Sequence, residues 1–171
     1  MKTNITTCQF EMLEANLQAL STRMPDLPLD ALLLSRLLLH VSREFASMLK
    51  QQIRPSGLSE AEFWVLTTLF SQPEGVAHPS DLCAGAGQSP AKMSRIGDAL
   101  VSRDLITRVL SAQDRRRVVI TITEHGEKLV RQLLARIFAP LHIMLGIFSE
   151  EEQQYFISQL KRLARGRFCT R

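Results

Sequence analysis

The sequence predicts a mainly α-helical fold that carries one small β-hairpin. Long segments with apolar residues at helical spacing fill most of the 171 residues. One stretch, residues 105–123, alternates apolar and polar residues on both sides of a polar, basic turn. Residues 88–117 hold seven basic and three acidic side chains, so all of the net charge of +4 lies there. The length suits one domain with an extension for oligomerisation.

The first two helices are expected over residues 8–24 and from residue 29 or 30 to about residue 52. Apolar residues at helical spacing predict the first of them: Met12, Leu13, Leu17 and Leu20. Pro25 and Pro28 separate the two helices. The second has too many apolar positions for one stripe. We therefore expect it to be covered on more than one side, as in a helix shared with a partner subunit.

The third helix begins with strong N-terminal signals. Ser59 and Glu62 form a Ser-x-x-Glu capping box, and Leu58 and Phe63 are placed for a hydrophobic staple. Trp64 follows within the same helix, and we expect it in the core.

A helix-turn-helix comes next. A short extended piece at residues 76–78 precedes a short helix at 79–85, and a longer helix at 90–103 begins with Ser89 as N-cap and Pro90 in the first helical position. The expected apolar face of the longer helix is Met93, Ile96, Leu100 and Val101. Its opposite face is polar and basic and holds Gln88, Ala91, Lys92 and Arg95. Two helices of this kind joined by a tight turn are typical of DNA-binding domains.

Two strands, residues 105–110 and 117–123, complete this domain as a β-hairpin with a basic tip, which is a wing. The inward side chains expected on the second strand are Val118, Ile120 and Ile122. Thr123 caps a long helix that we expect to kink at Pro140, and Ser149 and Glu152 form the capping box of a final helix.

The predicted domains follow from these elements. Residues 55–123 are expected to form the winged helix-turn-helix DNA-binding domain. Residues 1–54 are N-terminal helices that dimerise together with residues 137–171. Residues 124–171 are C-terminal helices that serve both as a linker and in dimerisation. The terminal helices hold more apolar surface than a small winged domain can cover, which predicts a homodimer.

The predicted DNA-contacting residues belong to two elements. At the start of the second helix of the motif, short and basic side chains can approach base edges and phosphates in the major groove: Gln88, Ser89, Pro90, Ala91, Lys92, Ser94 and Arg95. In the wing, Arg115 or Arg116 would enter the minor groove, Asp114 would orient Arg116, and Arg117 would meet a phosphate. The alternatives are an ordinary exposed helix face and an ion pair that only stabilises the wing tip.

Several motifs of this chain point to one family: Pro-Ser-Asp-Leu at 79–82, residues 94–101 and 105–108, and Asp-Arg-Arg-Arg at 114–117 followed by Thr-Glu-His-Gly at 123–126. Across residues 29–163 the sequence resembles the MarR family of bacterial transcriptional regulators, and is most similar to the branch that represses multidrug efflux pumps. The resemblance implies an obligate homodimer that represses from a pseudo-palindromic operator. It also implies release by a small phenolic, lipophilic or oxidising effector.

The resemblance also implies an effector pocket. It would lie between the long helix that ends near residue 52, the third helix and the start of the helix after the wing. The candidate effector-binding residues are His40, Arg43, Phe63, Trp64 and His125. The alternatives are that Trp64 belongs to the core and that His40 is satisfied within the protein or faces solvent.

Other functions have weaker support in the sequence. Cys8 could make the protein a thiol-based sensor of oxidation, although no basic residue adjoins it, and Cys83 is expected to act as a small buried hydrophobe. The spacing of histidines and cysteines predicts no metal, and no cofactor or catalytic motif is present, so we expect no enzyme. A winged-helix module that binds only protein is another alternative, against which the clustered basic charge argues.

The expected location is the cytoplasm. The three cysteines are odd in number and far apart, the N-terminus has no apolar run, and charges interrupt the most apolar stretch at residues 27–41. We therefore expect no membrane association.

Overall fold

The structure is a computed structural model that describes residues 3–110 and 118–166, with side chains from residue 11 onward within these ranges. The chain divides into two compact units, Met1–Met48 and Leu49–Arg171. The predicted residues Asp114, Arg115, Arg116 and Arg117 and the Cys8 thiol lie outside the described part.

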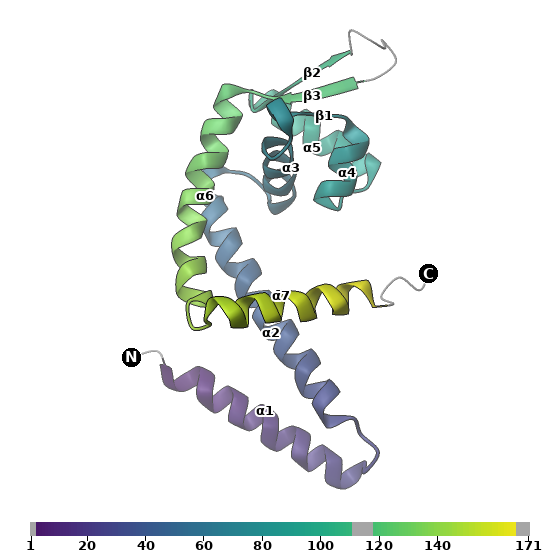
Figure 1. Ribbon diagram of the computed structural model, residues 1–171, viewed down its shortest axis with the longest axis vertical. Helices are drawn as coiled ribbons and strands as arrows, with labels where there is room; N and C mark the ends of the chain where they lie inside the picture. Colours follow the sequence, from purple (N-terminus) through teal and green to yellow (C-terminus); the bar gives the residue numbers. More distant parts are fainter. Residues whose placement is uncertain (1–2, 111–117, 167–171) are drawn as a thin grey trace. The chain divides into compact units, whose positions relative to one another are not determined.

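The first unit contains α1 (Thr3–Arg23) and most of α2 (Leu29–Ile53), drawn in purple and blue in Figure 1. α1 begins five residues before the start that the sequence predicted. The connection between the helices forms two short-range hydrogen bonds. The amide of Met24 donates to the carbonyl of Leu20, and the amide of Leu27 donates to the carbonyl of Met24. Pro25 and Pro28 lie in this connection, as predicted, because neither can continue a helix interior.

The second unit opens with the last turn of α2 and the 3-10 helix η1 (Arg54–Ser56). The remaining elements are α3 (Glu60–Phe70), η2 (Pro73–Gly75), β1 (Val76–Ala77), α4 (Pro79–Ala86), α5 (Pro90–Ser102), β2 (Ile106–Leu110), β3 (Val118–Ile122), α6 (Glu124–Leu145) and α7 (Glu150–Arg165). Figure 1 shows the strands beside α3, α4 and α5. This order confirms the predicted mainly α fold with a small β-wing.

The sheet is antiparallel, with strand order β1-β3-β2. Arg108 on β2 lies opposite Ile120 on β3, and Val76 on β1 lies opposite Thr121. The extended piece predicted at residues 76–78 therefore becomes a third strand, which covers one edge of the hairpin.

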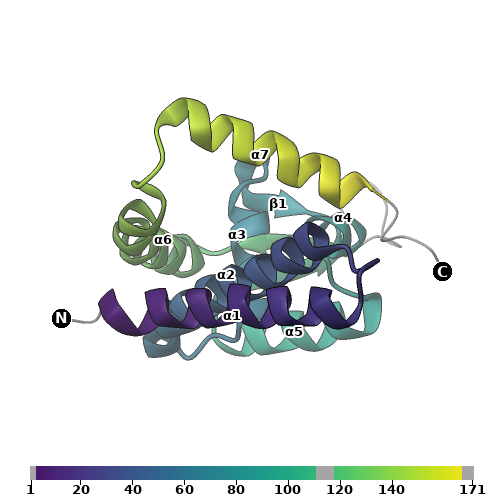
Figure 2. The same cartoon turned by 90° about the horizontal axis from the view of Figure 1, so that it is seen from below.

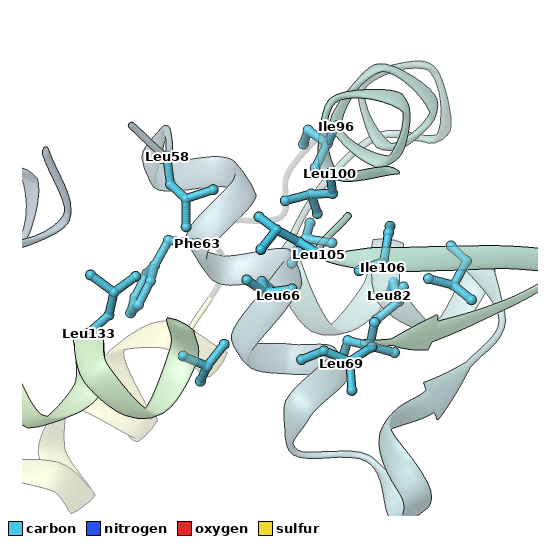
Figure 3. Close-up of a cluster of buried hydrophobic side chains, with 14 of the residues drawn as sticks. Leu58, Phe63, Leu66, Leu69, Leu82, Ile96, Leu100, Leu105, Ile106 and Leu133 are labelled. Atoms are coloured by element: carbon cyan, nitrogen blue, oxygen red, sulfur yellow. The ribbon is translucent and has the colours of Figure 1, made fainter. Parts of the chain in front are cut away.

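The start of α3 has the predicted cap. The Ser59 side chain accepts a hydrogen bond from the amide of Glu62, and the Glu62 carboxylate accepts one from the amide of Ser59 at 2.6 Å. Leu58 and Phe63 are both buried, and the Leu58 side chain extends toward Phe63 (Figure 3). The hydrophobic staple therefore also forms.

The core of the second unit is built around α3. Figure 3 shows Phe63 directed toward Leu133 of α6, and Leu69 of the same helix near Leu82 of α4. Ile96 and Leu100 of α5 close another side of this core. Each large side chain buried here stabilises the fold by roughly 1.5–3 kcal/mol. The helix that carries the predicted DNA-contacting residues is thus packed against the core of the second unit.

Three sequence-based expectations about burial were wrong. Trp64 is 44% exposed, because Phe63, Leu66 and Leu69 fill the core face of α3. Val101 is 41% exposed, and Gly97 takes its place on the buried face of α5. Val118 is 37% exposed because it lies at the end of β3 remote from the core, whereas Ile120 and Ile122 are buried.

Two further features concern the C-terminal helices and Cys83. α6 runs through Pro140 without ending there, and the chain turns by 99° between α6 and α7 (Figure 2).

Cys83 is half-buried and packs against the core. Among the described residues no single helix is long and apolar enough to cross a membrane. Of the described helices, only the bent pair α6 and α7, taken together, has the length and apolar composition of a membrane span.

Candidate nucleic-acid interface

The turn between α4 and α5 is tight because specific residues end one helix and begin the next. Gly87 adopts a left-handed conformation (φ 61°), and its amide donates to the carbonyl of Cys83. A residue without a Cβ is favoured in this conformation. Ser89 then caps α5 by accepting a hydrogen bond from the amide of Lys92, and Pro90 occupies the first turn. The two helices of the motif are therefore separated by only three residues.

The first turns of α5 present the predicted side chains to solvent. Six of the seven predicted major-groove residues are exposed: Ser89, Pro90, Ala91, Lys92, Ser94 and Arg95. Gln88 is half-buried, and its side-chain amide donates to the carbonyl of Ala86 at 2.9 Å. The opposite face, with Met93 and Ile96, is buried. The exposed face thus combines two cations with the partial positive charge of a helix N-terminus, which attracts phosphate.

Arg108 joins the wing to α5. One nitrogen of its guanidinium lies 2.5 Å from the carboxylate of Asp98, and another donates to the carbonyl of Ser94 at 3.0 Å. The two contacts hold β2 against the middle of α5. Charge-assisted hydrogen bonds of this kind are stronger than neutral ones. The helix and the base of the wing therefore share a fixed orientation.

Gly97 provides the space for this contact. A Cβ at this position would lie 1.7 Å from an Arg108 guanidinium nitrogen, so no larger residue fits while Arg108 stays in place. Glycine in a helix interior costs about 1 kcal/mol relative to alanine. From the sequence alone Arg108 and Asp98 are recognisable only as charges, because their pairing depends on the packing of two separate elements. The glycine inside a predicted helix was the available signal for a close contact.

A surface hollow of about 600 Å³ lies between α4, α5 and the base of the wing. Its lining is mostly apolar, with Met93, Ile120 and Val118 on its walls, and Ser94 and Arg108 are polar residues within it. Pro90 and Ser94 of the exposed face of α5 thus line the same hollow as Arg108 and Val118 at the base of the wing.

Comparisons with known proteins agree with this geometry. No family model matches the chain. AbsC, a MarR family transcriptional regulator from Streptomyces coelicolor, has a similar structure, with a TM-score of 0.70, 24% identity, and coverage of 75% of this chain and 88% of AbsC. The transcriptional repressor MprA from Escherichia coli (strain K12) is 30% identical over 156 residues, which are 91% of this chain and 86% of MprA. The chain belongs to the MarR family of transcriptional regulators.

Membership in the MarR family confirms the predicted function. The chain is a DNA-binding transcriptional repressor and not an enzyme. BpsR from Bordetella bronchiseptica also has a similar fold, with a TM-score of 0.67, 23% identity, and coverage of 77% of this chain and 93% of BpsR. The DNA binding of BpsR is regulated by 6-hydroxynicotinic acid.

The predicted effector residues of this MarR protein lie in both units. His40 is half-buried and Arg43 is exposed in the first unit. In the second unit Phe63 is buried in the core, while Trp64 and His125 are exposed. The Trp64 indole donates to the carboxylate of Glu60 at 3.3 Å, and its ring meets Phe63 edge-on. Their role in effector binding stays a prediction.

Within the described ranges, no three His, Cys, Asp or Glu side chains are grouped so that they could hold a metal ion. The wing-tip arginines and a redox role of Cys8 stay predictions, because these side chains lie outside the described part of the chain.

Proposed function

We propose that this MarR repressor reads a pseudo-palindromic operator by placing the first turns of α5 in the major groove. The observation that supports this most directly is the exposed, cationic N-terminal face of α5, held against the wing by Arg108. Lys92 and Arg95 would contact guanine edges or phosphates, and the short side chains Ser89, Pro90 and Ala91 would let the backbone come close. Gln88 and Ser94 would border this contact.

In the same proposal the wing tip enters the adjacent minor groove. Arg115 or Arg116 would insert where a narrow A·T-rich groove concentrates negative potential. Asp114 would hold Arg116 in orientation, and Arg117 would neutralise a phosphate. The base of the wing supports this arrangement, because residues 111–117 connect β2 and β3 in sequence and this strand pair is held to α5 by Arg108.

The repressor would act as a homodimer. Exposed apolar side chains lie on the C-terminal helices and on the turn that joins them: Phe138, Ile143, Ile147, Tyr155, Phe156, Ile157, Leu160 and Leu163. Large exposed apolar patches mark association sites. We propose that residues 1–54 and 137–171 form the dimer, that 55–123 bind DNA, and that 124–171 also link the two functions. Two winged domains related by symmetry match the two halves of a palindrome.

Release would follow binding of a small phenolic or lipophilic effector near His40, Arg43, Phe63, Trp64 and His125. Support comes from BpsR, whose DNA binding responds to the aromatic acid 6-hydroxynicotinic acid. Exposure of Trp64 and His125 makes both available to a ligand. The place of action would be the cytoplasm, where such a repressor meets DNA.

The experiment is selection of bound duplexes from genomic DNA, followed by titration of the selected duplex with Lys92→Ala. We expect Lys92→Ala to bind the duplex more weakly than the wild type. If Lys92 contacts a phosphate, the slope of log affinity against log salt concentration should also fall by about one. Lys50→Ala removes the same charge from an exposed position on α2 and serves as the control. Equal affinities of Lys92→Ala and the wild type would place the interface elsewhere.

A further inference from the structure

Arg103 makes a long-range contact that the DNA interface does not use. It follows the last residue of α5, and its guanidinium donates to the backbone carbonyl of Ser56 at 2.6 Å. The two residues are 47 positions apart, and the contact is partly buried. This hydrogen bond ties the C-terminal end of α5 to η1, the short helix that follows α2.

The segment that receives this hydrogen bond is held in one conformation. The Ser56 hydroxyl donates to the carbonyl of Ile53 at 2.6 Å and accepts from the amide of Leu58 at 3.2 Å. Gly57 closes the turn in a left-handed conformation (φ 70°). Ile53 and Leu58, on either side of the turn, are both buried in the core. Arg103 therefore binds a fixed acceptor.

A second element holds the residues that follow Arg103. The Thr123 hydroxyl, which caps α6, donates to the carbonyl of Asp104 at 2.7 Å. The amide of Thr123 donates to the carbonyl of Leu105 at 3.1 Å. At Gly126 a Cβ would lie 2.2 Å from the Leu105 carbonyl oxygen, so α6 packs directly on this turn. The C-terminal end of α5 is thus fixed to η1 through Arg103 and to α6 through Thr123.

We propose that Arg103 is a positioning residue that sets the angle at which α5 presents its other end to DNA. α5 has 13 residues, so Arg103 stands about 20 Å along the helix axis from the Ser89 cap. A small rotation at the Arg103 end would displace Lys92 and Arg95 from their partners. The inference depends on the proposed binding of operator DNA by α5, and it assigns Arg103 no contact with DNA.

The test compares the operator affinity of Arg103→Met with that of the wild type at several salt concentrations. Methionine keeps an apolar stem and removes the charge and the donors. We expect binding to weaken about tenfold, within the range known for couplings between distant residues. The slope of affinity against salt should not change, because no phosphate contact is lost. A direct phosphate contact would lower that slope by about one.

Arg54→Met is the matched control. Arg54 is exposed in η1, two residues from Ser56, and no hydrogen bond or ion pair of its side chain occurs among the described residues. It should bind the operator as the wild type does. Arg103→Lys keeps a donor and the charge, so it should recover most of the lost affinity. Should Arg103→Met fail to fold, Arg103→Gln replaces it.

Three outcomes would overturn the assignment: equal losses in the Arg103 and Arg54 variants, a reduced salt slope for Arg103→Met, or no recovery with lysine. Failure of the wild-type protein to bind any duplex would instead contradict the proposed function. The two failures are therefore distinguishable.

Discussion

At the scale of single residues, the proposed interface combines arginines whose side chains bind to the protein with cations whose side chains face solvent. Arg108 binds Asp98 and the carbonyl of Ser94, and Arg103 binds the carbonyl of Ser56. Lys92 and Arg95 are exposed on α5. The clustered charge at residues 88–117 therefore has two physical roles. Arg103 and Arg108 hold α5 in place, and the exposed Lys92 and Arg95 are available to phosphates.

Gly97→Ala should weaken operator binding about tenfold without lowering the free energy of unfolding. The new Cβ overlaps the flexible end of Arg108, which can move away, and alanine favours the helix by up to about 1 kcal/mol. Displacing Arg108 breaks its contacts with Asp98 and Ser94. Titration of operator DNA and urea unfolding measure the two effects.

A double-mutant cycle with Arg108→Met tests the cause. In that background Gly97→Ala should have no further effect on DNA affinity, because the contact is already gone. Additive losses would mean that Gly97 acts independently of Arg108.

At the scale of elements, four N-caps mark where helices of the second unit begin. Ser59, Ser89, Thr123 and Ser149 each accept a hydrogen bond from the amide three residues later. The same short pattern therefore begins α3, α5, α6 and α7. Only the cap of α5 also lies in the proposed DNA interface.

Ser59→Ala and Ser89→Ala should each lower the free energy of unfolding by about 1 kcal/mol, the usual value of an N-cap. Only Ser89→Ala should also weaken DNA binding at temperatures where both variants are folded. Urea unfolding and fluorescence anisotropy with labelled operator provide the two measurements. Equal DNA affinities of the two variants would remove the start of α5 from the proposed interface.

At the scale of the whole molecule, the two C-terminal helices expose apolar side chains that no other part of the described chain covers. Phe156, Leu160 and Leu163 are spaced by four and three residues and form one stripe of α7, and all three are exposed. Phe148 stacks on Phe156 with ring centroids 6.0 Å apart. An exposed apolar stripe of this kind marks a surface for association. A second copy of the chain is the partner that we propose.

Leu160→Glu should convert the protein from a dimer to a species of 19.3 kDa, because a carboxylate cannot be buried in an apolar contact without a partner. Gln154→Glu adds the same charge on the opposite face of α7 and should leave the dimer intact. Sedimentation velocity distinguishes the two species. A wild-type protein that sediments as a monomer would contradict the proposed dimer.

Local chemistry made most elements of this protein predictable. The capping residues Ser59, Ser89 and Thr123, together with Gly87 and Pro90, determine where helices begin and end through contacts within a few positions. The alternation of apolar residues in β3 likewise predicted a strand. These signals are short-range, so they can be interpreted without knowing what the chain packs against.

Tertiary packing decided the rest. The burial of Gly97 in place of Val101, the exposure of Trp64 and the third strand β1 all depend on which surfaces meet. The Arg108 and Arg103 contacts join residues 10 to 47 positions apart, and no local pattern encodes such distances. The sequence by itself determined the helices, the wing and the positive charge. Only the contacts of α5 with β2, and of the residues at its C-terminal end with η1 and α6, decided which of the described charges are held by the protein and which are exposed.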